Sequence, residues 1–124
     1  MRKKIFAILM MLISFVLANN TFAQSYDQDY STSGNLYERT TISVPAGTLD
    51  YSLSVTCSST NPNSSSEVYF GTSEDGTLAY TYCYYGYYSS GRSTSGSVVL
   101  PSDRDVNIVA IILDGGTISI SLDW

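Results

Sequence analysis

Apolar and polar residues alternate along most of the chain beyond residue 35. From residue 49 to residue 57 every second side chain is apolar or aromatic. The residues between them are Asp50, Ser52, Ser54 and Thr56. A period of two over such a length predicts a β-strand with one buried face. Residues 39–44 and 118–124 alternate in the same way, so the C-terminus is expected to be tied into a sheet.

The remaining strands are predicted from short apolar runs between turn signals. They cover residues 68–72, 77–85, 96–100 and 106–113. The turn at 73–76 ends in a glycine that can take a positive φ, so the first two of these strands should form a hairpin. The run at 106–113 is almost wholly apolar, which predicts a central strand covered on both faces. Residues 114–116, Asp-Gly-Gly, predict a tight hairpin turn before the last strand.

About seven short strands, regular turn signals and few good helix formers predict an all-β fold. We expect a single small β-sandwich or jelly-roll-like domain of about seven antiparallel strands over residues 36–124. Residues 24–35 are polar and aperiodic, and are predicted to be a flexible N-terminal arm.

The first 23 residues have the pattern of a cleavable secretory signal peptide. Three basic residues at positions 2–4 precede an almost wholly apolar run over residues 5–18, and a small residue, Ala23, precedes the expected cut. A cut after Ala18 is the alternative. The apolar run is shorter than the roughly 20 residues that cross a bilayer, so a permanent membrane anchor is disfavoured. The rest of the chain is therefore expected to be secreted or extracytoplasmic.

Charge and composition narrow the range of partners. Beyond residue 23 the bases are Arg39, Arg92 and Arg104, against eleven acids, so cleavage would change the formal charge from −5 to about −8. Nucleic acids and anionic membrane surfaces are recognised by basic surfaces, so neither is an expected partner.

The same composition disfavours catalysis. The chain has no histidine, which removes Ser-His and Cys-His nucleophile pairs, and both lysines lie in the predicted signal peptide. A pair of carboxylates acting as glycosidase acid and base is the route left open. Since a domain of this size has little room for a deep cleft, we predict that the protein is not an enzyme.

Two cysteines, Cys57 and Cys83, lie beyond the signal peptide. In an exported protein an even count favours a disulfide, which would close a loop of about 26 residues and contribute roughly 3 kcal/mol. The alternative is a pair of unbonded, half-buried thiols. Their spacing fits no zinc motif and histidine ligands are absent, so no metal and no cofactor are predicted.

Acidic pairs at 27/29, 74/75 and 103/105 are candidate calcium ligands. Calcium takes six to eight oxygen ligands, and a loop such as 102–105 could supply two carboxylates. Arg104 lies between those two carboxylates and no full ligand series is present. We therefore expect these acids to cap turns.

The segment 80–92, YTYCYYGYYSSGR, contains six of the eleven tyrosines within nine positions. In a strand over 77–85, Tyr80, Tyr82 and Tyr84 would share one face. Two faces cannot bury so many hydroxyls without partners, so several rings are expected to be exposed around Gly86. The predicted ligand-binding residues are Tyr84, Tyr85, Tyr87, Tyr88 and Arg92. The alternative is that the tyrosines only cover the faces of a sheet, with their hydroxyls in water.

These observations favour a secreted, non-catalytic binding or adhesion protein. Its partner would be an extracellular ligand, such as a carbohydrate or a cell-surface component, bound by the tyrosine-rich loop because exposed tyrosines give rigid contact area and suit the apolar faces of sugar rings. The alternative is a self-assembling matrix, fibre or pore component, since natural monomers often protect edge strands with lysine and this domain has none. A small inhibitor of a secreted enzyme is a third class that no motif favours.

Overall fold

The computed structural model describes residues 23–88 and 90–124, so the predicted signal peptide lies outside the described residues except for Ala23. The described part contains eight strands and no helix. They are β1 (Ser25–Thr32), β2 (Leu36–Val44), β3 (Gly47–Cys57), β4 (Ser65–Thr72), β5 (Gly76–Tyr84), β6 (Arg92–Leu100), β7 (Arg104–Leu113) and β8 (Gly116–Asp123). No helix in these residues is long and apolar enough to cross a membrane. The predicted all-β sandwich is confirmed, with eight strands in place of about seven.

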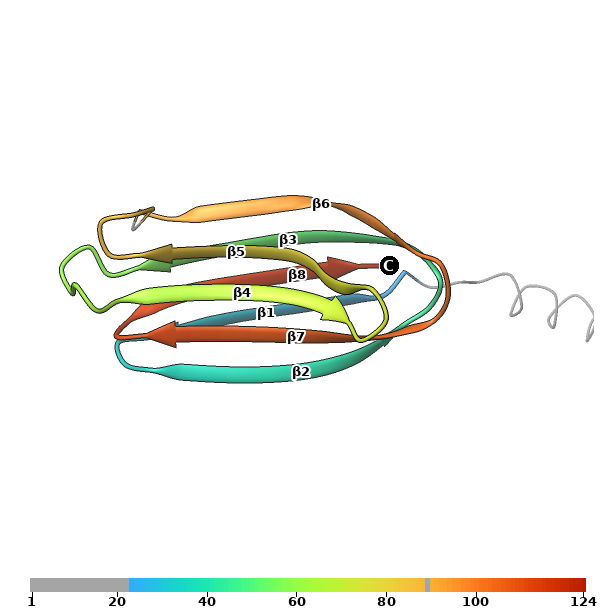
Figure 1. Cartoon of the computed structure of the whole chain (residues 1–124), viewed down its shortest axis with the longest axis horizontal. Helices are drawn as coiled ribbons and strands as arrows, with labels where there is room; N and C mark the ends of the chain where they lie inside the picture. The colour runs from blue at the N-terminus through green and yellow to red at the C-terminus, as the bar shows by residue number, and fades with distance from the viewer. Residues whose placement is uncertain (1–22, 89) are drawn as a thin grey trace, which may run out of the picture.

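The strands form two four-stranded antiparallel sheets, in the orders β1-β8-β3-β6 and β2-β7-β4-β5. Figure 1 shows these as two layers, with β5 and β6 at one side and β1 and β2 at the other. Successive strands change sheet everywhere except at β4–β5, which is the hairpin that the sequence predicts.

The prediction of a hairpin at residues 114–116 is wrong. These residues carry the chain from β7 in one sheet to β8 in the other. The turn is held from a different loop, because Asn35 Oδ1 accepts from the amide of Asp114 at 2.8 Å and Gly34 O accepts from Gly115 at 2.9 Å. Turn residues such as these allow a tight reversal of the chain. Packing of the whole sandwich decides which neighbour the following strand pairs with.

The predicted flexible arm at residues 24–35 is also wrong, because most of it forms strand β1. This strand pairs with β8 from Ser25↔Asp123 to Thr32↔Gly116. Tyr26 and Tyr30 pack against the core, and burial together with the hydroxyl of Tyr26 raises the pKa of Tyr30 to about 12. An edge strand needs only a few half-buried side chains. The polar composition of β1 therefore gave no clear strand pattern in the sequence.

The core lies between the inner faces of the two sheets. Its largest fully buried side chain, Phe70, meets the ring of Tyr51 edge-on at a centroid distance of 5.3 Å. Tyr51 in turn lies over Gly96 on the neighbouring strand, where an added Cβ would come within 2.9 Å of the tyrosine hydroxyl. Glycine at this position therefore makes room for an aromatic pair that links the two sheets.

Strand β7 is central in its sheet, between β2 and β4, as its apolar run predicts. Within residues 23–88 and 90–124 no second layer covers its outer face, which differs from the expectation. Val109 is buried there between its register neighbours Arg39 and Tyr69, but Leu113 is 45% exposed. An apolar strip therefore runs along the outer face of this sheet.

Candidate ligand-binding face

Strand β5 is an edge strand that directs a row of tyrosines outward. Ala79, Thr81 and Cys83 are buried, whereas Tyr80 and Tyr84 are each 46% exposed. The period of two therefore divides this strand as the sequence predicts, with small side chains on the core face and large aromatic ones outside. Hydroxyls on the outer face stay in reach of water, so they need no buried partner.

A tight turn at Tyr85-Gly86 adds further rings to this row. Tyr84 and Tyr87 exchange backbone hydrogen bonds of 3.0 and 2.8 Å, and Gly86 has a φ of 76°, a conformation that glycine adopts without steric cost. The turn places the ring of Tyr87 against that of Tyr84, with centroids 4.9 Å apart and planes inclined by 18°. Tyr88 follows with a positive φ of 57°, an uncommon conformation for a residue with a side chain.

We call the resulting group of rings the tyrosine cluster. It consists of Tyr69, Tyr80, Tyr82, Tyr84, Tyr87 and Tyr88. Along β5 the rings are near-parallel, with centroids 5.3 Å apart for Tyr80–Tyr82 and 6.1 Å for Tyr82–Tyr84. This is offset stacking, so the inner rings have neighbours beside their faces. The cluster therefore presents ring edges and hydroxyls more than the flat aromatic surface that the sequence suggests.

Arg92 joins the cluster from the opposite sheet. Its guanidinium carbon lies 5.1 Å from the ring centroid of Tyr82 and 4.6 Å from that of Tyr88. A cation over two aromatic faces is attracted by both ring quadrupoles. Arg92 begins β6, so this contact connects the adjoining edges of the two sheets. The N–H groups of Arg92 are the cationic hydrogen-bond donors of the cluster.

The structure brings together four of the five residues predicted from sequence: Tyr84, Tyr87, Tyr88 and Arg92. Tyr85 is 43% exposed but makes no ring contact with the cluster among the described residues. Sequence reasoning left Tyr69, Tyr80 and Tyr82 out of the site. The alternation in β5 already contained the signal for the last two, whereas Tyr69 joins through its register pairing with Tyr80.

The same outer face continues across the sheet. In one row of register partners, Tyr37, Ile111 and Glu67 lead from β2 to Tyr82 on β5. Tyr37 is 64% exposed, and Glu67 accepts a hydrogen bond of 3.2 Å from the hydroxyl of Tyr80. The face therefore combines aromatic groups at both sides with the apolar strip of β7 and a few charged groups between them.

Ionisation of two cluster hydroxyls is disfavoured. Burial, the charge of Glu67 and its hydrogen bond raise the pKa of Tyr80, and the side-chain hydrogen bond with Tyr88 raises that of Tyr87. A raised pKa in the folded state stabilises the fold below the unfolded tyrosine value of about 10, and this contribution is lost as pH rises through the folded pKa. We expect absorbance titration of the folded protein to show a set of tyrosines ionising above pH 10 that moves to about 10 in denaturant. Identical titrations of the folded and denatured protein would contradict the cluster geometry.

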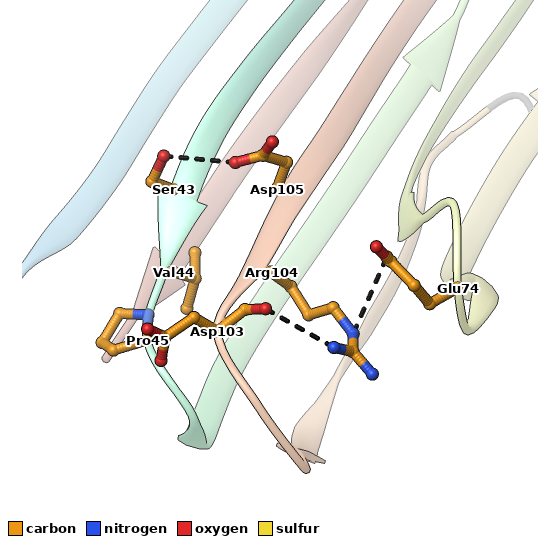
Figure 2. A pocket seen from close by; sticks show the side chains of 7 residues that line it. All are labelled: Ser43, Val44, Pro45, Glu74, Asp103, Arg104 and Asp105. Carbon is orange, nitrogen blue, oxygen red and sulfur yellow. Dashed lines mark hydrogen bonds and ion pairs between the residues drawn. The ribbon is translucent and has the colours of Figure 1, made fainter.

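A polar pocket of about 490 Å³ lies at the other end of the sandwich (Figure 2). It is lined by Ser43, Val44, Pro45, Glu74, Asp103, Arg104 and Asp105. Asp103 accepts from the amide of Ala46 at 2.9 Å, and Asp75 accepts from Arg104 Nε at 2.9 Å, which lowers the pKa of Asp75. Asp103 caps a turn, as expected. Glu74 and Asp75 instead pair with Arg104, and Asp27 and Asp29 lie within strand β1, so the expectation of turn caps does not hold for all three pairs. The described residues hold no group of three or more acids, cysteines or histidines placed to bind a metal ion.

Cys57 and Cys83 lie in the core, on β3 and β5 of opposite sheets. Both are free thiols in the structure, so the predicted disulfide is not formed there and stays a prediction.

Comparison with known proteins does not assign a family. No family model matches the chain, and no curated protein matches it either. Among solved structures, TmCBM61 in complex with beta-1,4-galactotriose is 5% identical, covers 86% of this chain and 83% of its own, and has a TM-score of 0.46. The VP2 subviral particle of infectious bursal disease virus is 8% identical with a TM-score of 0.48 over 83% of this chain, which spans 33% of VP2. These similarities are confined to the arrangement of strands.

Proposed function

We propose that this protein is an exported, non-catalytic binding protein that recognises an extracellular glycan or other hydroxyl-rich cell-surface ligand. The binding surface is the outer face of the β2-β7-β4-β5 sheet, centred on the tyrosine cluster. The observation that carries the proposal is the gathering of six tyrosines on one exposed face, beside an apolar strip that no second layer covers in the described part of the chain.

Exposed aromatic and apolar groups of this extent are uncommon on a soluble monomer unless they contact a partner. The rings are already held against one another by stacking and by Arg92, so little side-chain freedom remains to be lost on binding. Tyrosine also keeps a polar tip, which suits a contact surface that stays partly wet.

The chemistry of the face favours a neutral, hydroxyl-rich ligand. Tyrosine hydroxyls both donate and accept hydrogen bonds, and Arg92 adds N–H donors. The apolar strip around Ile111 and Leu113 can contact the C–H groups of sugar rings. Acids outnumber bases by eleven to three beyond residue 23, so polyanionic ligands are repelled.

Binding to neutral polysaccharides should therefore exceed binding to sulfated or uronic-acid polymers of similar length. Because charge contributes little, we expect the dissociation constant to change by no more than about two-fold between roughly 0.05 and 0.5 M salt. Polysaccharide pull-down followed by calorimetry measures both effects. A preference for sulfated polymers that weakens steeply with salt would contradict the proposal.

Two features support a non-catalytic role. The carboxylate that the cluster contacts, Glu67, is engaged by the hydroxyl of Tyr80 at 3.2 Å. A glycosidase requires two carboxyl groups on either side of the scissile bond. The chain also has no histidine to activate a hydroxyl or thiol nucleophile.

Self-association through β6 is the second candidate function. This edge strand carries no charge between Arg92 and Asp103 and exposes Val99 by 75%, whereas β1 at the opposite edge carries Asp27 and Asp29. Uncharged edges are prone to pair with another strand. Analytical ultracentrifugation tests this: concentration-dependent dimers that disappear with Ser95→Lys but persist with Gln28→Lys on β1 would support it. A monomer at all concentrations would exclude it.

A further inference from the structure

The two sheets converge at the end of the sandwich where β3 ends and β4 begins. Ser66 Oγ on β4 donates to the carbonyl of Thr56 on β3 at 2.8 Å, which links the sheets directly. A Cβ on Gly116 would lie 2.3 Å from Ser66 Oγ and 2.5 Å from Thr56 O, so only glycine fits there. Facing sheets are ordinarily about 10 Å apart, and these small residues allow a closer approach.

Both cysteines lie at this convergence. Cys57 directly follows Thr56, and Cys83 is the register partner of Ser66. Their side chains face the core, with 7% and 1% of each residue exposed, and the thiol of Cys57 lies close enough to help raise the pKa of Cys83. A disulfide requires Cβ atoms about 3.5–4.5 Å apart, which paired thiols from converging strands can reach with small movements.

The two thiols differ in access. A pocket of about 470 Å³ at this end has Cys57 among its lining residues, together with residues of three loops, and does not include Cys83. Burial and the neighbouring Cys57 raise the pKa of Cys83 to about 12, which keeps it a thiol. Cys57 is thus the more exposed of the two cysteines and the one that lines the pocket, so a small reagent would reach it before Cys83.

We propose that Cys57 and Cys83 form an inter-sheet disulfide by exchange with a low-molecular-weight disulfide, and that this bond holds the tyrosine-bearing strand β5 against the opposite sheet. With oxidised glutathione, the Cys57 thiolate attacks one sulfur, forms a mixed disulfide and releases one glutathione. Cys83 then loses its proton and attacks the Cys57 sulfur, releasing the second glutathione. Two protons and two electrons pass from the protein to the reagent.

The position of Cys83 determines which segment the disulfide would restrain. Cys83 lies between Tyr82 and Tyr84 on an edge strand that is hydrogen-bonded along one side only, to β4. A covalent link to β3 would therefore restrain the segment that presents the tyrosine cluster. This inference concerns the conformation of β5, and it stands whether or not the cluster binds a glycan.

Exchange of the purified reduced protein with oxidised glutathione, followed by intact-mass analysis, tests the chemistry. The unmodified chain should lose the mass of two hydrogens. The Cys83→Ser variant should retain one glutathione on Cys57, and the Cys57→Ser variant should gain little. Two alkylatable thiols after exchange, or glutathione retained mainly on Cys83, would overturn the proposal.

Hydrogen exchange of the oxidised and reduced forms tests the consequence. Closing a loop of this length shifts the opening equilibrium by about two orders of magnitude. Amides of β5 should therefore exchange up to about a hundred-fold more slowly in the oxidised protein, with a smaller change in β2, which lies at the opposite side of its sheet. Equal exchange of β5 in both forms would show that the bond does not restrain this strand.

Discussion

Alanine at Tyr82, Tyr84 and Tyr87 together should weaken ligand binding at least about a hundred-fold while leaving the fold intact. These three rings form the centre of the cluster, with mutual centroid distances of 4.9 to 6.3 Å. Central aromatic residues of an interface commonly contribute about 2 kcal/mol or more each, so losing three removes most of the affinity. Calorimetry with the neutral polysaccharide that the unmodified protein binds measures the loss, and circular dichroism checks the fold.

Phenylalanine at the same three positions is the matched control. It keeps the stacked rings and removes only the hydroxyls, so we expect an intermediate loss of about ten-fold if ring edges and hydroxyls both contact the ligand. A Val99→Ala variant on β6, in the other sheet, should bind normally. Unchanged binding by the alanine variant would remove the tyrosine cluster from the site.

Phe70→Ala should have the largest effect on stability. Phe70 is fully buried and contacts Tyr51 edge-on across the core. Truncating a buried phenylalanine costs about 3–5 kcal/mol, a large part of the roughly 5–15 kcal/mol that stabilises a domain. Denaturant unfolding should show a much lower midpoint with a similar slope.

Val99→Ala is again a suitable control, because Val99 is an exposed aliphatic residue on β6. Its free energy of unfolding should change by no more than about 0.5 kcal/mol. A loss below about 1 kcal/mol for Phe70→Ala would mean that the aromatic pair does not lie at the centre of the core.

Strand positions were predictable from sequence wherever burial is one-sided. The period of two in β3 and β8 follows directly from side chains that alternate between the core and water. Strand β1 was not predicted, because on its inner face only Tyr26 and Tyr30 pack against the core and their neighbours in the sequence are polar. Strand pairing was predictable for the β4–β5 hairpin but not at residues 114–116, which have hairpin chemistry yet connect two different sheets.

The candidate site could likewise be predicted only in part. Alternation places Tyr80, Tyr82 and Tyr84 on one face from sequence alone. The additions of Tyr69 and Arg92 depend on long-range geometry: the register of β4 against β5, and the meeting of the β5 and β6 edges. Ring stacking also follows from three-dimensional packing, and it changes the expected contact surface from ring faces to edges and hydroxyls.

We propose above that the outer face of the β2-β7-β4-β5 sheet binds a neutral, hydroxyl-rich ligand. Titration of isotope-labelled protein with a neutral oligosaccharide, followed by nuclear magnetic resonance, tests it most directly. Shift changes should concentrate on β5, the 84–88 turn and the outer face of β7. Changes centred on the outer face of the β1-β8-β3-β6 sheet, or at the polar pocket around Arg104, would contradict it.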